Sequence, residues 1–198
     1  MTELPAALLQ TDENQLARLH TRLVADAAAS GLLDIAYRTV DSPVGSLLVA
    51  ASDRGLMKVA FEVQDHDAVL AALAEKVSPR ILRAPGRLDP VARQLEEYFA
   101  GTRRSFDLEL DWSLSSGFRR QVLDHLMRIG YGRTESYAEV AAGAGNPKAV
   151  RAVGTACATN PLVLVVPCHR VVRSDGSAGG YAGGVQAKAT LLELEAAA

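Results

Sequence analysis

Apolar residues recur along the chain first at helical spacing. Within residues 14–30 one helical face is apolar, and Gly31 follows the run. The apolar positions on that face are Leu16, Leu19, Leu23, Val24 and Ala27. Spacings of three and four residues that end at a glycine predict an amphipathic helix. We interpret residues 1–34 as an extra N-terminal helical segment that serves packing or a partner contact.

From residue 35 the spacing changes to that of short strands. Three β-prone runs occupy residues 35–40, 46–51 and 56–61, and Ser-Pro-Val-Gly and Ser-Asp-Arg-Gly separate them. Short runs joined by tight turns predict an antiparallel sheet. The elements expected to cover this sheet are a helix at 67–76, a strand at 80–82 and a helix at 90–99. Together they predict an α/β scaffold domain over residues 35–101.

A mostly helical domain is expected over residues 116–198, after a connector at 102–115. Its first helix is predicted from residue 118 to about 129, because the apolar residues there share one face. Ser136 is a helix cap, a glycine-bearing turn follows, and Pro147 is expected to start a second helix that reaches Ala158. Helix, short turn and helix are typical of a helix-turn-helix. A plain helical hairpin has the same pattern, so the pattern alone leaves both interpretations open.

Charge is distributed unevenly between the two parts of this 198-residue chain, whose net charge is -2. Residues 1–115 carry 12 basic and 17 acidic side chains, whereas residues 116–198 carry 9 basic and 6 acidic ones. The basic excess of the second part suits a polyanionic partner. No apolar run is long enough to span a bilayer, and acidic residues occupy the N-terminus where a secretion signal would be basic and then apolar. We therefore expect a cytoplasmic protein without a membrane partner.

The two cysteines, Cys157 and Cys168, are too few for a disulfide framework or a four-cysteine zinc site. Cys168 follows Pro167 and an apolar run at 162–166, which predicts a thiol displayed at the end of a short buried strand. A thiol becomes a nucleophile as the thiolate, and the next residue, His169, is a potential base. Because neighbouring strand residues point to opposite faces, a structural cysteine remains an equal alternative on this evidence.

Several motifs in fixed order surround this cysteine. They are Asn160-Pro161, Pro167-Cys168-His169-Arg170-Val171, Gly180-Tyr181-Ala182-Gly183-Gly184, and Lys188 through Leu191-Leu192 to Glu195. The set resembles the methylated-DNA-protein-cysteine methyltransferases, which repair guanine alkylated at its O6 atom. The resemblance is most specific over residues 136–195 and looser from residue 35. It implies a ribonuclease-H-like, non-catalytic N-terminal domain followed by a catalytic domain with a helix-turn-helix.

The resemblance also implies a catalytic set built around Cys168, the residue that would accept the alkyl group. His169 would activate the thiol through a bridging water, and Glu195 would orient the histidine. Asn160 would tie the second helix of the motif to the active-site segment by bonding backbone groups. No cofactor and no metal ion is implied.

A further set of residues is assigned by resemblance to the DNA. Tyr137 would crowd the phosphate of the flipped nucleotide, and Arg151 would fill the gap in the base stack. Lys148 and Arg173 would also contact the DNA, Lys148 through a phosphate or the base stack. Because Ala158 stands where some relatives carry a basic residue, binding would be weaker or would depend more on these two residues.

The pocket for the flipped base would be closed by the glycine-rich loop at 176–184. Tyr181 offers a stacking face and a hydroxyl that can donate to the departing O6 atom. The other members of the predicted base pocket are Val171, Ala182 and Lys188. Ala182 departs from the serine that the family often has there.

We therefore expect a monomeric, single-turnover repair protein that acts on double-stranded DNA carrying alkylated guanine. One alternative is a non-catalytic helix-turn-helix protein that marks lesions, but such relatives lack the reactive cysteine. A second is a regulatory fusion with a zinc-bound cysteine sensor, for which the cysteines are too few. A third is a thiol oxidoreductase or hydrolase, for which neither a second cysteine at redox spacing nor a separate base is evident.

Overall fold

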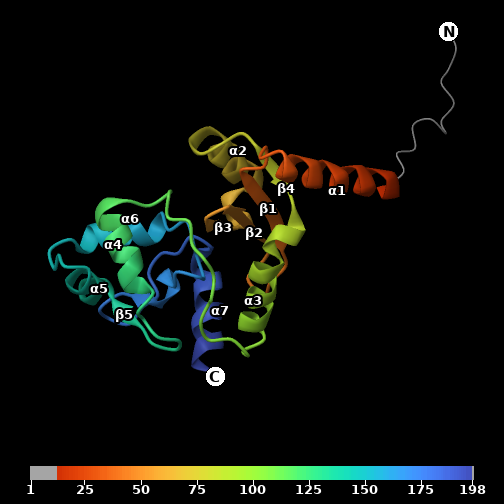
Figure 1. Ribbon diagram of the computed structural model, residues 1–198. Coiled ribbons are helices and arrows are strands. Elements are labelled where there is room, and N and C mark those ends of the chain that lie inside the picture. The colour runs from red at the N-terminus through yellow and green to blue at the C-terminus, as the bar shows by residue number, and fades with distance from the viewer. Residues whose placement is uncertain (1–12, 198) are drawn as a thin grey trace, which may run out of the picture.

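The computed structural model describes residues 13–197, and Figure 1 shows a sheet part and a helical part packed side by side. The sheet order is β3-β2-β1-β4. Its strands are β1 (Ile35–Val40), β2 (Leu47–Ser52), β3 (Gly55–Phe61) and β4 (Ile81–Arg83). The first three pair antiparallel, which confirms the predicted meander.

The strand β4 adds a parallel pairing to the antiparallel meander, and no direction was predicted for this strand from the sequence. It pairs with β1 in parallel, with Ile35 opposite Ile81. The reason is the connection: α2 (His66–Lys76) carries the chain from β3 back across the sheet, and a helical crossover returns the next strand in the same direction. The chain then enters a 3-10 turn at Pro85–Leu88 and α3 (Asp89–Phe99).

The predicted N-terminal helix is present as α1 (Glu13–Ala29), beside the sheet part in Figure 1. None of its residues is buried. Leu16, Leu19 and Leu23 are each more than half exposed, so much of the apolar face is turned to solvent. None of the helices in residues 13–197 is long and apolar enough to cross a membrane.

The helical part contains four α-helices and a two-stranded parallel pairing. Its elements are α4 (Gly117–Leu126), β5 (Glu135–Ser136), α5 (Tyr137–Gly143), α6 (Val150–Ala158), the 3-10 turn Cys168–Arg170, β6 (Val171–Val172) and α7 (Gly184–Ala196). Ser136 caps α5 as predicted, in a capping box with Glu139. The second helix of the motif begins at Val150 and not at Pro147, because residues 146–149 close into a turn in which Ala149 N–H donates to Asn146 O at 2.9 Å.

The apolar run at 162–166 does not form the predicted buried strand. Leu164 adopts a left-handed conformation with φ of 72°, and Val166 N–H then donates back to Leu162 O at 2.8 Å. This folds the run into a compact turn. Its contact with the sheet is a bridge to β3, in which Val59 N–H donates to Pro161 O at 2.8 Å.

One hydrophobic core joins the two parts. It includes Val59 of β3, Leu95 of α3, Leu123 of α4, Val166 of the compact turn and Leu191 of α7. Because this core is continuous, α3 of the sheet part lies against α7 of the helical part, as Figure 1 shows. The segment that carries Cys168 is therefore held from both sides.

Candidate active site

Cys168 begins a 3-10 turn and is 2% exposed. Its position is set by Asn160, which follows α6. The Asn160 amide donates to Val166 O at 2.9 Å and to Cys168 Sγ at 3.2 Å. Its carbonyl oxygen accepts from Leu162 N–H at 2.9 Å. One buried side chain thus fixes both ends of the compact turn and contacts the sulfur.

Glu195 on α7 is a buried carboxylate that accepts hydrogen bonds from four residues. His169 Nε2 lies 2.9 Å from Oε1, and Arg170 donates through Nε to Oε2 at 2.8 Å and through Nη2 to Oε1 at 2.9 Å. The hydroxyl of Tyr98 donates to Oε1 at 2.7 Å, and Gly132 N–H donates to Oε2 at 3.1 Å. Because a carboxylate accepts, His169 carries its proton on Nε2 and presents Nδ1 as an acceptor.

A glycine is required at position 132 for two reasons. Its φ is +68°, and a Cβ there would lie 2.9 Å from the backbone oxygen of Glu195. A side chain would push α7 away from the loop that supplies one of the donors to the carboxylate.

The protonation states of the pair follow from burial and its partners. Burial alone would raise the pKa of Glu195, but hydrogen bonds from His169 and Arg170 outweigh it and hold the pKa well below its usual range. Burial lowers the pKa of His169, and the adjacent carboxylate opposes that effect only in part. At neutral pH the site therefore contains a carboxylate and a neutral imidazole that can accept a proton.

The thiol of Cys168 is protonated in the resting protein. Burial raises its pKa to about 11, against the opposing effects of the Asn160 hydrogen bond and the Lys188 charge. The Lys188 side chain is fully buried and donates to Val171 O at 2.5 Å. Burial also raises the pKa of Cys157, on α6. Nucleophilic attack by Cys168 therefore requires a base that removes its proton during the reaction.

Two buried polar atoms beside the thiol have no partner in residues 13–197: His169 Nδ1 and the Tyr181 hydroxyl. The Tyr181 ring packs between Phe61 of β3 at 5.4 Å and His169 at 6.3 Å between centroids. Gly183 permits this arrangement, because a Cβ there would lie 2.9 Å from the Phe61 ring. Buried polar atoms without partners are rare, and both atoms here are left able to form a hydrogen bond with another group.

The residues predicted to contact DNA lie outside this buried cluster. Tyr137, the first residue of α5, is half-buried, and burial together with Cys157 and Cys168 raises its pKa. Lys148, Arg151 and Arg173 are exposed. They lie in the turn before α6, at the second residue of α6, and directly after β6. Of the predicted base pocket, Val171 and Lys188 contact each other, and Ala182 is half-buried beside Tyr181.

Tyr98 and Gly132 are site residues that the sequence analysis did not find. Tyr98 lies 97 positions from Glu195, in the part interpreted as a scaffold, and nothing in its local sequence indicates a role. Arg170 also belongs to the site: its side chain is 9% exposed and donates to Glu195 and to Ile129 O. Its position in the sequence directly after Cys168 and His169 is the feature that could have indicated its place in the site.

Comparison with known proteins gives matches across both parts. Residues 35–112 match the 6-O-methylguanine DNA methyltransferase ribonuclease-like domain, and residues 117–197 match the DNA binding domain of the same family. A methylated-DNA-protein-cysteine methyltransferase of Mycolicibacterium paratuberculosis is 43% identical over 161 residues, 81% of this chain and 92% of that protein. A relative in Methanosarcina barkeri with the same name is 39% identical over 80% of this chain and 96% of its own length.

Solved structures agree. The O6-methylguanine methyltransferase of Mycobacterium tuberculosis has a TM-score of 0.73 at 38% identity and covers 82% of this chain and 93% of its own. A structure of the Mycobacterium tuberculosis protein OGT in complex with DNA has a TM-score of 0.71 at 37% identity, with the same coverage. The chain therefore belongs to the methylated-DNA-protein-cysteine methyltransferase family.

Proposed function

We propose that this protein repairs DNA by moving an alkyl group from the O6 atom of guanine to the sulfur of its own Cys168, irreversibly and once per polypeptide. The observation that carries this proposal is a buried thiol bonded to Asn160 beside a neutral imidazole fixed by Glu195. A protein that only marks lesions has no use for such a thiol.

The transfer requires one proton to leave the thiol before or during attack. His169 Nδ1, without a partner in the described structure, would accept it through a bridging water, since no direct bond joins the imidazole to Cys168 Sγ in residues 13–197. The resulting imidazolium is stabilised by Glu195. Arg170 keeps that carboxylate ionised and fixed in place.

The bonds exchanged are one C–O and one S–C. Sulfur attacks the alkyl carbon, the bond between that carbon and O6 breaks, and the guanine leaves with the electron pair. Tyr181 would donate a hydrogen bond to O6, because burial raises its pKa and keeps the hydroxyl protonated. The guanine then takes up a proton, so the net change is an alkyl group in place of the thiol hydrogen.

Access to the thiol requires the nucleotide to rotate out of the duplex, because O6 is otherwise held within the base stack. We propose that Arg151 fills the gap, that Tyr137 crowds the displaced phosphate, and that Lys148 and Arg173 bind neighbouring phosphates. The three cations are exposed, which supports this assignment. The base would lie against Tyr181, Val171, Ala182 and Lys188.

The same account assigns a role to each part of the chain. We propose that residues 35–101 form a scaffold, that residues 102–115 connect it to the rest, and that residues 116–198 bind DNA and perform the transfer. The substrate would be double-stranded DNA carrying alkylated guanine, met in the cytoplasm by a monomer. No cofactor is needed, because the thiol, the base and the carboxylate are all supplied by the chain.

Intact mass tests this proposal. After incubation with duplex containing O6-methylguanine, the protein should gain one methyl group in place of one hydrogen. Cys168→Ser should gain nothing and still bind the duplex, because a serine hydroxyl is a far weaker nucleophile. Cys157→Ser is the matched control and should still be methylated. Methylation of Cys168→Ser at the wild-type rate would overturn the assignment.

A further inference from the structure

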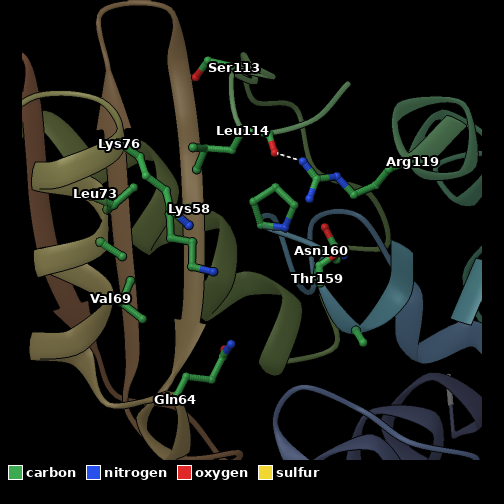
Figure 2. A pocket seen from close by; sticks show the side chains of 13 residues that line it. Lys58, Gln64, Val69, Leu73, Lys76, Ser113, Leu114, Arg119, Thr159 and Asn160 are labelled. Carbon is green, nitrogen blue, oxygen red and sulfur yellow. Dashed lines mark hydrogen bonds between the residues drawn. The ribbon is translucent and has the colours of Figure 1, made fainter. Parts of the chain in front are cut away.

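A second pocket lies between the sheet part and the helical part, away from the glycine-rich loop. Its volume is about 550 Å³, and we call it the interdomain pocket. Figure 2 shows three cationic side chains that reach it from different elements: Lys58 from β3, Lys76 from α2 and Arg119 from α4. Its remaining wall includes Thr159 and Asn160 at the end of α6.

The lining of the interdomain pocket is rich in hydrogen-bond donors. None of its lining residues in the described part of the chain is acidic, although residues 1–115 have 17 acidic and only 12 basic side chains. Gln64 accepts from Phe61 N–H through its carbonyl oxygen, so its amide nitrogen is left to donate. Arg119 bonds Leu114 O through one guanidinium nitrogen and keeps other N–H groups, as Figure 2 shows.

In the described part of the chain, no acidic side chain neutralises the two lysines. Within residues 13–197 neither Lys58 nor Lys76 takes part in an ion pair, whereas Arg80 and Arg87 on the same part of the chain are each paired with an aspartate. Burial lowers the pKa of Lys58, and the charge of Lys76 lowers it further. The fold therefore holds like charges together at an electrostatic cost that a bound anion would offset.

We propose that the interdomain pocket binds a phosphate-bearing anion through Lys58, Lys76 and Arg119. Phosphate fits this donor set because the guanidinium binds two oxygens in a fork and the lysines supply compact positive charge. The volume is within the range of small-molecule sites, roughly 300–1,000 Å³. The pocket shares Asn160 with the thiol site, but this proposal does not depend on whether Cys168 accepts alkyl groups.

Two sources can supply that phosphate. One is the DNA backbone. Thr159 on the pocket wall lies eight residues beyond Arg151, the residue proposed to enter the base stack, on the same helical segment and about 12 Å along its axis. The other is a free molecule with a polyphosphate chain. In either case the ligand would sit beside Asn160, whose amide contacts Cys168 Sγ, and beside Pro161, whose carbonyl accepts from β3. Occupancy would therefore stabilise the contact between the sheet and the thiol segment.

The test compares two double variants that remove the same charge. Lys58→Gln with Lys76→Gln removes two cations from the interdomain pocket. Arg18→Gln with Arg128→Gln removes two exposed cations from elsewhere and is the matched control. Lys76→Gln alone serves as a milder variant, because Lys76 is exposed and its loss leaves the core intact.

Two measurements distinguish the sources. The first is thermal unfolding with increasing tripolyphosphate, which should raise the midpoint of the wild type and the control by about 5 °C at a hundredfold excess over the dissociation constant. The pocket variant should lose most of this rise. The second is affinity for an unmodified duplex at several salt concentrations. If the pocket contacts the DNA backbone, the slope of log affinity against log salt concentration should be smaller for the pocket variant than for the control by about 1–2.

A loss that is confined to the pocket variants supports the site in either measurement. Loss of the stabilisation by tripolyphosphate identifies a free phosphate compound as the ligand, and a smaller salt slope of duplex binding identifies the DNA backbone. The proposal is overturned if the pocket variant, the single Lys76→Gln variant and the control all behave alike in both measurements.

Discussion

The hydroxyl of Tyr98 donates a 2.7 Å hydrogen bond to Oε1 of Glu195, across the interface between the sheet part and the helical part. Both residues are buried. The same carboxylate oxygen is 2.9 Å from His169 Nε2. A residue of the part interpreted as a scaffold thus bonds the carboxylate that orients the proposed base, and we interpret Tyr98 as a positioning residue.

Replacement of Tyr98 by phenylalanine should weaken the carboxylate site. Removing one buried hydrogen bond to a charged group should lower the free energy of unfolding by about 2 kcal/mol. Transfer to Cys168 should slow by no more than about tenfold, because His169 and Arg170 still bond Glu195. Urea unfolding and single-turnover transfer rates measure the two effects.

Tyr37→Phe is the matched control for that experiment. Tyr37 is half-buried in β1, and its hydroxyl makes no hydrogen bond in the described structure. Its removal should change neither quantity. If both variants behave alike, the bond from Tyr98 to Glu195 does not contribute to the site.

Stability should fall in alkali in a way that depends on Cys168. Its pKa is about 9 in the unfolded chain and about 11 in the folded protein, so the folded state retains a proton that the unfolded state releases. The contribution of this thiol to the free energy of unfolding is fully present below pH 9. It is lost as the pH rises from 9 to 11, and its size is on the order of 2 kcal/mol. Urea unfolding of the wild type and Cys168→Ala at pH 8 and pH 10.5 measures it. The wild type should lose more stability than the variant, and equal losses would show that the thiol is not shielded.

Arg151→Ala should slow repair of duplex DNA much more than dealkylation of free O6-methylguanine. In the role proposed for it, the arginine acts on the unstacking of the base, which costs a few kcal/mol, and not on the thiol. We expect a loss of about 10- to 100-fold on duplex and little change on the free base. Lys148→Ala is the comparison variant. If it loses one phosphate contact with DNA, the slope of log affinity against log salt concentration should fall in size by about 1. Equal losses of Arg151→Ala on both substrates would remove the role assigned to it.

The alkylated protein should be less stable than the fresh one. Cys168 is 2% exposed and packed against Asn160, so an added methyl group has little room. Overpacking of this kind costs about 1–3 kcal/mol. Thermal unfolding of the protein before and after reaction with methylated duplex measures the difference. An unchanged midpoint would mean that the sulfur has more space than its burial indicates.

The sequence predicted the elements well where periodicity or turns define them. The strand β1 has the predicted bounds 35–40, and α3 starts one residue before the prediction. The run at 162–166 was mispredicted because its composition is that of a strand. Its conformation depends on Asn160 and on the positive φ of Leu164, and neither is visible in an apolar pattern.

The residues of the candidate site could be predicted where they belong to a sequence motif, but not where only the fold brings them together. Cys168 and His169 are adjacent in sequence, and Glu195 was found through resemblance. The bond from Tyr98 depends on how α3 packs against α7, which local sequence does not encode. The cationic lining of the interdomain pocket likewise brings together Lys58, Lys76 and Arg119 from three separate elements.

Stoichiometry tests the central claim most directly. In the proposed reaction, transfer to Cys168 forms a thioether, which thiol exchange does not cleave. A fixed amount of protein should be titrated with excess duplex carrying O6-methylguanine, and the restored guanine should be counted. The account predicts that repair stops at one methyl group per polypeptide, with that group on Cys168. More than one group removed per polypeptide would contradict it.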